Sequence, residues 1–392
     1  MYLSEFYNRL RLDKSLADRT GFNPYYCEIR SGLSDPIIIN SESFINLASN
    51  NYLGLADDTG VKESAIEAVR KYGASLCGTP IATGYIDLFR RVEERLSKFT
   101  GLESSIVLPS CYQANNGLFA AIANNEDLII IDHYAHSSLV QGIKASGCRI
   151  RPFLHNDMDH LSSILEKSLK YRQIFIVTES VFSTDGSIAP LKEITDLAAR
   201  YNAVPVVDDS HGIGVIGRNG RGILEECGIH HYQGIYTASL GKALANSGGV
   251  ISGRKDFIDY LRYYCPHLVY STALPPSILG GVEKVLDIIE KDFSTIGSRM
   301  WKYRNILNQS LASSGFKLAQ GKAPITSICT GSPEDTVILA KRFYENRVLT
   351  TPFIEPSVPV NEGKVRLIAG ANLEEKTIDT VVEIIKKLGS EA

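Results

Sequence analysis

The chain has 392 residues, of which 44% are hydrophobic and 22% are charged. These fractions are typical of globular proteins and exclude a disordered chain or a long coiled coil. The 41 basic and 44 acidic residues leave a formal net charge of −3. This balance argues against a nucleic-acid-binding protein, which normally carries a basic excess. No apolar run reaches the roughly 18 residues that a membrane-spanning helix needs, so we expect no membrane span.

The N-terminus and the cysteines both indicate where in the cell the protein is located. The first 20 residues mix charged and apolar side chains, a pattern that excludes a secretory signal peptide. It favours an amphipathic helix packed on the body of the protein or on a partner. The seven cysteines are widely spaced and form no CxxC or Cys/His ligand pattern. We therefore expect free thiols in a reducing cytoplasm and no metal site.

The middle of the chain alternates short apolar runs with segments of helical length and periodicity. The expected strands are 105–108, 128–132, 174–179, 204–208, 234–237 and 249–252. The expected helices between them are 114–123, 138–146, 159–171 and 191–201. This alternation predicts an α/β fold, in which helices cover both faces of a mostly parallel sheet. Ligands of such a sheet bind at the carboxyl ends of its strands.

The pattern changes after residue 276. A long helical stretch over 277–311 precedes a smaller α+β unit with strands near 325–329 and 365–367. We predict three parts, which are an N-terminal arm (1–55) that joins the small domain, a large domain (56–289) and a small C-terminal domain (290–392).

Two ionisable residues follow buried strands in the second half of the large domain. Asp208 ends the run VPVVD, and Lys242 follows Ser-Leu-Gly after the next strand. A carboxylate at such a place needs a cation, and the glycine-rich surroundings of the lysine leave backbone amides free for an anion. Taken singly, Asp208 is also explained as a helix cap and Lys242 as a solvated lysine. Together they indicate pyridoxal phosphate held as a Schiff base on Lys242, with Asp208 paired to the protonated pyridine nitrogen.

Further polar residues at strand ends fit the same cofactor. We expect Ser239 to bond the phosphate and His211 to reach the 3′-oxygen of the ring. Residues 110–115 open a helix whose first amides can cradle the phosphate. His136 follows another strand end and can stack on the ring, although a histidine that merely caps a helix explains it equally well on its own.

The remaining candidates concern the cofactor's surroundings and the substrate. Ser183 is a candidate cofactor contact, and Glu179, at the end of its strand, is a candidate acceptor behind it. Arg366 can clamp a carboxylate with its guanidinium, although a lone arginine in a strand is also explained by a surface ion pair. Asn50 can hydrogen-bond the same carboxylate from the N-terminal arm.

Seven segments, in this order, resemble the α-oxoamine synthases, a branch of the fold-type I pyridoxal phosphate enzymes. They are NLASNNYLGLA, RVEERLSKFTG, VTESVFSTDGSIAPL, VVDDSHGIGVIGRNGRG, TASLGKAL, HLVYSTALPP and VPVNEGKVRL. The resemblance runs from about residue 46 to the C-terminus. It implies the fold-type I transferase fold, with a seven-stranded, mostly parallel sheet and a smaller C-terminal α+β domain. The activity it implies is an acyltransferase that condenses an amino acid with an acyl-CoA and releases CO2.

The resemblance assigns the same roles to Lys242, Asp208, His211, His136, Ser239, Ser183, Asn50 and Arg366, and it adds five residues. Cys111 and Tyr112 match backbone contacts to the phosphate. Ser271 and Thr272 match a segment that reaches the phosphate of the neighbouring subunit, and Ser357 matches a position near the acyl substrate. The implied assembly is a homodimer with shared active sites, which a two-fold interface permits.

The implied chemistry places Lys242 as the base that removes the α-proton of the amino acid and His136 at the acyl carbonyl. The acyl donor is acyl-CoA or an acyl-carrier protein. Different segments match different branches of the family, so the amino acid and the acyl-chain length stay open. Two alternatives also stay open, namely another fold-type I reaction (an aminotransferase or amino-acid decarboxylase) and a family member without catalytic activity.

Overall fold

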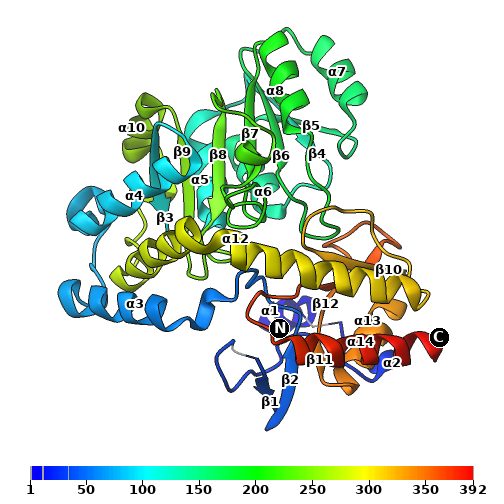
Figure 1. Cartoon of the computed structure of the whole chain (residues 1–392). Helices are drawn as coiled ribbons and strands as arrows, with labels where there is room; N and C mark the ends of the chain where they lie inside the picture. Colours follow the sequence, from blue (N-terminus) through cyan, green and yellow to red (C-terminus); the bar gives the residue numbers. More distant parts are fainter. Residues whose placement is uncertain (1, 11–12, 34, 392) are drawn as a thin grey trace.

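A seven-stranded sheet forms the centre of the computed structural model, which describes residues 2–10, 13–33 and 35–391 (Figure 1). The strand order is β3 (Ser104–Leu108), β9 (Gly249–Gly253), β8 (Ile235–Ser239), β7 (Val204–Asp208), β6 (Ile174–Glu179), β4 (Leu128–Asp132) and β5 (Arg149–Phe153). β9 runs antiparallel to both of its neighbours, and the other neighbouring pairs are parallel. The expectation of a mostly parallel sheet in an α/β fold is therefore confirmed.

Helices cover both faces of this sheet because successive side chains of a strand point to opposite faces. In β4, Ile129 and Ile131 pack with α5 (Cys111–Ile122) and α6 (Ser137–Ser146). Leu128 and Ile130 of the same strand pack on the other face with α7 (Met158–Glu166) and α8 (Leu191–Arg200). With both faces buried, the strands read as continuous apolar runs rather than as alternating patterns.

The smaller unit contains the N-terminal arm and the strands and helices that follow residue 313. Its antiparallel sheet has the order β10 (Thr326–Gly331), β13 (Gly363–Leu367) and β12 (Thr351–Phe353). The helices α13 (Pro333–Glu345) and α14 (Glu375–Ser390) pack in the same unit. In the arm, β2 (Glu42–Asn46) pairs with β1 (Ile37–Ile39) and, in parallel, with β11 (Val348–Leu349). The arm thus joins the small unit, as its sequence suggested.

One long helix, α12 (Pro276–Ser313), runs along both units (Figure 1). It packs against α3 (Thr59–Tyr72) and α4 (Asp87–Thr100) near its start and against α14 nearer its end. Residue 290, where we placed the start of the small domain, lies inside this helix. The three-part division of the chain remains a prediction.

The N-terminal segment forms two short helices, α1 (Tyr2–Arg9) and α2 (Ser15–Thr20), where we expected one amphipathic helix. Residues 11–12 between them lie outside the described ranges. α2 rests on α13, where the Lys341 Nζ donates a hydrogen bond to the Thr20 carbonyl at 3.1 Å. All seven cysteines are free. Within the ranges described, no helix combines the length and apolarity needed to cross a membrane, and no cluster of side chains suits a metal ion.

Candidate active site

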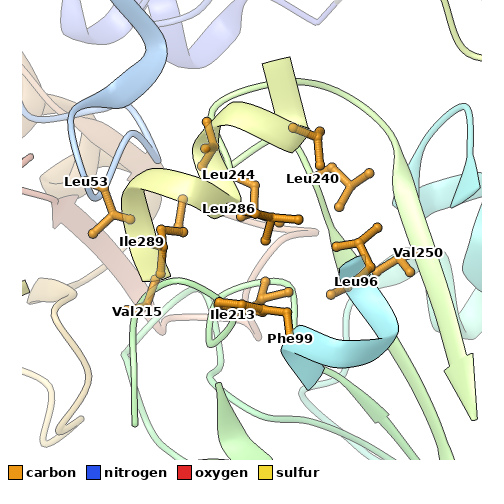
Figure 2. Packing of buried hydrophobic residues seen from close by; sticks show 14 of the residues in the cluster. Leu53, Leu96, Phe99, Ile213, Val215, Leu240, Leu244, Val250, Leu286 and Ile289 are labelled. Atoms are coloured by element: carbon orange, nitrogen blue, oxygen red, sulfur yellow. The ribbon is translucent and has the colours of Figure 1, made fainter. Parts of the chain in front are cut away.

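The loop after β8 presents Lys242 at the carboxyl end of the sheet. Leu240 and Leu244, on either side of the lysine, are fully buried among side chains of α4 and α12. Figure 2 shows both leucines in the same cluster as Leu286 and Ile289 of α12. Within the described part of the chain the Lys242 side chain forms no hydrogen bond, so packing of its neighbours alone holds the half-buried amine in place.

The surroundings of Lys242 make its amine easier to deprotonate than that of a solvated lysine. Burial lowers the pKa of Lys242, because the charged ammonium loses its hydration, and the carboxylates of Asp208 and Glu179 oppose this change. Asp208 and Glu179 are paired across β7 and β6 at the ends of these strands. The lysine is therefore a half-buried amine near two buried acids.

Asp208 is 4% exposed, and each of its carboxylate oxygens accepts a hydrogen bond from an N–H group. It accepts hydrogen bonds from Asn115 Nδ2 at 2.7 Å and from the Ser210 amide at 3.0 Å. Asn115, which is fully buried on α5, accepts in turn from Thr237 Oγ1 at 2.8 Å. The Cys111 thiol lies 4.0 Å from both carboxylate oxygens. These contacts fix the carboxylate's orientation at the end of β7.

The first turn of α5 comes close to the backbone of β9. Ser110 caps the helix by accepting from the Gln113 amide at 3.1 Å. A Cβ on Gly249 would lie 2.5 Å from the Cys111 nitrogen, so only glycine permits this approach. Tyr112, in the same turn, is 47% exposed. The unpaired amides at this helix end are suited to an anion such as a phosphate.

His136 occupies the N-cap of α6 and also lies beside the two acids. Its Nδ1 accepts from the Ser138 amide at 3.2 Å, and its own amide donates to Glu179 Oε1 at 2.5 Å. Burial lowers the pKa of His136, an effect that Asp208 opposes. Burial likewise raises the pKa of Glu179, with Asp208 adding to the rise. The helix-cap reading of His136 is thus correct for Nδ1, while Nε2 stays available for a ligand.

His211 is buried and is held by the N-terminal arm. Tyr52 Oη and His211 Nδ1 are 2.8 Å apart. Burial lowers the pKa of His211 well below its usual range, and Lys242 and Arg366 lower it further. Burial also raises the pKa of Tyr52, so both rings are neutral. The phenol has no other partner among the described residues, and it therefore donates to Nδ1 and leaves His211 with a proton on Nε2.

Arg366 is buried and Asn50 is half-buried, and both have unmet hydrogen-bonding capacity. Arg366, which is 5% exposed, donates from Nη1 to the Ser183 carbonyl at 3.1 Å and lies 4.9 Å from the Phe353 ring centroid. Its Nε and the Oδ1 of Asn50 have no partner among the described residues. A buried cation with a free N–H calls for an anion. The arginine is thus no surface ion pair, the alternative that its position in a strand had left open.

Four expected residues have contacts that leave their roles open. Ser271 and Thr272 lie between α11 (Pro266–Val269) and α12, and their side chains form no hydrogen bond within the described part of this single chain. Ser357 lines a pocket of about 280 Å³ between the two units. Ser239, at the end of β8, accepts from the Gly241 amide at 3.1 Å. The roles expected for these residues remain predictions.

Two residues that sequence reasoning missed belong to the centre of the site. Asn115 lies four positions after Cys111, on the same face of α5, and a buried amide in that register signals a polar partner on the sheet. Tyr52 stands in the segment ASNNYLGLA, but nothing local points from it to His211, since the two lie 159 positions apart.

Comparison with known proteins agrees with this geometry. Residues 42–385 match the family described as aminotransferase class I and II. The 8-amino-7-oxononanoate synthases of Alkaliphilus metalliredigens and Treponema denticola are each 34% identical to this chain, and each comparison covers at least 90% of both chains. A solved 8-amino-7-oxononanoate synthase from Francisella tularensis is 26% identical, with a TM-score of 0.76 over 89% of this chain and 98% of that one. A serine palmitoyltransferase from S. paucimobilis superposes with a TM-score of 0.94 over 99% of this chain and 98% of that one, and at 24% identity it shows the fold alone.

The fold and the site define a fold-type I pyridoxal phosphate enzyme of the acyltransferase type. The chain belongs to the aminotransferase class I and II family, as a member of its α-oxoamine synthase branch. Enzymes of this branch carry out a decarboxylative condensation of an amino acid with an acyl thioester.

Proposed function

We propose that the residues gathered around Lys242 carry this condensation in the present chain, with an amino acid and an acyl-CoA or acyl-carrier thioester as substrates. The proposal rests on two side chains at the site, Lys242 and Arg366, whose hydrogen-bonding capacity is not fully used within the chain. Lys242 is a half-buried amine without a hydrogen bond among the described residues, and Arg366 is a buried guanidinium with a free Nε. The first suits a carbonyl cofactor, and the second suits a carboxylate substrate.

The residues present fit pyridoxal phosphate. The buried carboxylate of Asp208 suits the ring's pyridinium nitrogen, and the Nε2 proton of His211 suits its 3′-oxygen. The α5 amides at Cys111 and Tyr112, where Gly249 keeps space open, suit the phosphate together with the Ser239 hydroxyl. When bound, this cofactor serves as the electron sink that stabilises a carbanion at the α-carbon of an amino acid.

The amino-acid carboxylate is held by Arg366 and Asn50 in this proposal. Arg366 is pre-positioned by its bond to the Ser183 carbonyl and by packing on Phe353. Its two-pronged guanidinium matches a carboxylate. Because the Arg366 side chain is already ordered before the substrate arrives, little conformational entropy is lost when it binds the amino acid.

Lys242 is the base in this proposal. With pyridoxal phosphate and an amino acid bound, Lys242 would supply a free amine close to the α-carbon, because it is also the residue that would hold the cofactor. Burial lowers the pKa of Lys242, which increases the fraction of neutral amine available to accept a proton near neutral pH. The same amine can return that proton after CO2 has left.

His136 and Ser357 act on the acyl side. The Nδ1 of His136 is occupied by the cap of α6, which leaves the proton on Nε2 to be donated to the thioester carbonyl oxygen. Ser357 lines the pocket through which we place the acyl donor. The free thiol leaves by the same path.

We further propose a cytoplasmic homodimer in which Ser271 and Thr272 reach the partner's phosphate site. Large exposed side chains support an interface near this segment, because a monomer rarely leaves so many uncovered together. They are Ile81, Tyr85, Tyr263, Tyr264 and Tyr270, which are between 42% and 85% exposed. Mixing chains that carry Lys242→Ala with chains that carry Thr272→Val tests shared sites. If the sites are shared, the turnover per intact Lys242 in the mixture should differ from that of the two variants measured separately. An activity of the mixture equal to the sum of the separate activities would contradict shared sites.

The reaction itself is tested by thiol release from the purified, cofactor-loaded protein. A panel of amino acids is combined with acyl-CoAs from acetyl through pimeloyl to decanoyl. Thiol release that depends on both substrates supports the proposal, and the best pair identifies the substrates. Release without any amino acid would indicate a thioesterase, and transamination or CO2 release without thiol would indicate another fold-type I reaction.

A further inference from the structure

A pocket of about 280 Å³ lies between the two units, beside the proposed substrate site. Its walls come from the loop after β4, from Thr184, from the segment 356–359 and from Lys364 of β13. Ala135 and Thr184 in these walls are chain neighbours of His136 and Ser183. The pocket therefore adjoins both the acyl side of the site and the residue that holds Arg366.

Lys364 shares its face of β13 with Arg366, because residues two apart in a strand point the same way. Arg366 uses this face for the proposed carboxylate clamp. Lys364 uses it to reach the pocket wall, where its ammonium lies 5.9 Å from the Tyr134 ring centroid. The Cα atoms of the two residues are thus about 7 Å apart along the strand, so both side chains can contact one extended substrate.

The charge on Lys364 is buried but poorly paired. The residue is 8% exposed, and its Nζ donates no hydrogen bond to any residue that the structure describes. Among the residues that the structure describes, its one ion pair is with Glu362, at 3.8 Å. Glu362 is half-exposed, and Tyr134 already donates to its Oε2 at 2.9 Å. An ammonium removed from water with this little compensation is costly unless a ligand supplies an anion.

We infer that Lys364 and this pocket bind an anionic group of the acyl donor. This inference rests on the proposed function and deepens it by naming the chemistry of the second substrate. Negatively charged oxygens enter from one of two sources, a carboxylate at the far end of the acyl chain or a phosphate of the thioester's carrier. Glu362 would keep its hydrogen bond from Tyr134 while the ammonium turns to the ligand.

The test compares donors that differ in one anionic group at a time. Heptanoyl and pimeloyl groups have the same length and differ in the terminal carboxylate. Each is supplied as a CoA thioester and as an N-acetylcysteamine thioester, which lacks every phosphate. The variants are Lys364→Met, which keeps the length of the side chain without its charge, and Lys364→Arg, which restores the charge. Lys317→Met removes an exposed lysine from the same region and serves as the matched control.

The inference predicts a selective rise in KM for Lys364→Met of roughly tenfold or more, the usual effect of losing a charge-assisted contact. If KM rises only for the two pimeloyl thioesters, the anionic group bound by Lys364 is the terminal carboxylate. If KM rises only for the two CoA thioesters, the anionic group is a phosphate of CoA. Lys364→Arg should recover most of the loss, and Lys317→Met should resemble the wild type.

Equilibrium binding gives a second readout that does not depend on turnover. Calorimetric titration of the cofactor-loaded protein with pimelate or with CoA should show affinity for one of them, which Lys364→Met weakens. Equal KM values for all four donors in Lys364→Met and the wild type, or an equal loss for all four, would overturn the inference. A wild-type protein that releases no thiol from any donor would instead overturn the proposed function.

Discussion

The phenol of Tyr52 and the imidazole of His211 form a 2.8 Å hydrogen bond that ties the N-terminal arm to the end of β7. Burial lowers the pKa of His211 and raises that of Tyr52, so neither ring is charged at neutral pH. The phenol then sets the tautomer of the imidazole and leaves a proton on Nε2. The arm contributes in this way to the chemistry of a site built mostly by the large unit.

Tyr52→Phe should weaken cofactor binding without unfolding the protein. The variant leaves His211 Nδ1 buried without a hydrogen-bond donor, which lowers the free energy of unfolding by about 1–3 kcal/mol. It also no longer fixes the tautomer of the imidazole. We expect a shift of the visible absorbance band and about a tenfold or greater rise in the dissociation constant for pyridoxal phosphate. The spectrum and the affinity are measured by titrating apoprotein, with thermal melting as the control for folding. An unchanged spectrum and affinity would show that His211 does not contact the cofactor.

Asp208→Asn should reduce kcat far more than it reduces the affinity for cofactor. The amide keeps the shape of the carboxylate but cannot hold a pyridinium proton by charge, so the ring is a weaker electron sink. Steady-state kinetics and cofactor titration are compared on the same preparation. Equal losses of affinity and kcat would mean that Asp208 only organises the end of β7.

Arg366→Lys should raise the KM for the amino acid by roughly tenfold or more, because one ammonium cannot replace a two-pronged guanidinium. The free Nε of Arg366 is the donor that this change removes. The absorbance of the bound cofactor should stay the same, which separates this variant from Tyr52→Phe. A KM equal to that of the wild type would place the substrate carboxylate elsewhere.

Asp209→Asn should change how stability depends on pH. Burial raises the pKa of Asp209 to about 7, although the hydrogen bonds that Tyr236 Oη and the Ile223 amide donate to its Oδ2 favour the charged form. A raised carboxyl pKa gives stability that is complete below the unfolded value of about 4 and is lost as pH rises through about 7. The melting temperature of Asp209→Asn relative to the wild type should therefore increase between pH 5 and pH 8.

The control for this profile is Asp196→Asn, which changes an exposed carboxylate on α8. Its melting temperature should differ from that of the wild type by the same amount at both pH values. A relative melting temperature of Asp209→Asn that does not change between pH 5 and pH 8 would contradict the raised pKa and show that the buried carboxyl is ionised throughout.

The strands that sequence predicts best are those that run through the centre of the sheet. β4, β6 and β7 begin and end at the expected residues, since each is an unbroken apolar run closed by a carboxylate. β5 was missed, because Arg149, Arg151 and Pro152 interrupt any apolar pattern. As an edge strand that pairs only with β4, it tolerates these residues.

The site was predictable where one residue type carries the chemistry and follows a strand. The positions of Asp208 at the end of its strand and of Lys242 after its strand are of this kind, whereas Arg366 lies within β13. The roles of all three remain predictions. Asn115 and Tyr52 act on Asp208 and His211 from elements distant in the chain, and the contacts exist only after the arm and α5 have packed on the sheet. The dual use of His136 was also hidden, because a cap and a ligand contact use different nitrogens of one ring.

The central claim is that Lys242 drives a condensation that couples loss of CO2 to release of thiol. The most direct measurement follows both products from a carboxyl-labelled amino acid and an acyl-CoA, with the wild type and Lys242→Ala side by side. We predict equal amounts of labelled CO2 and free thiol from the wild type, and neither product from Lys242→Ala. Thiol without CO2, or turnover that survives in Lys242→Ala, would contradict the account.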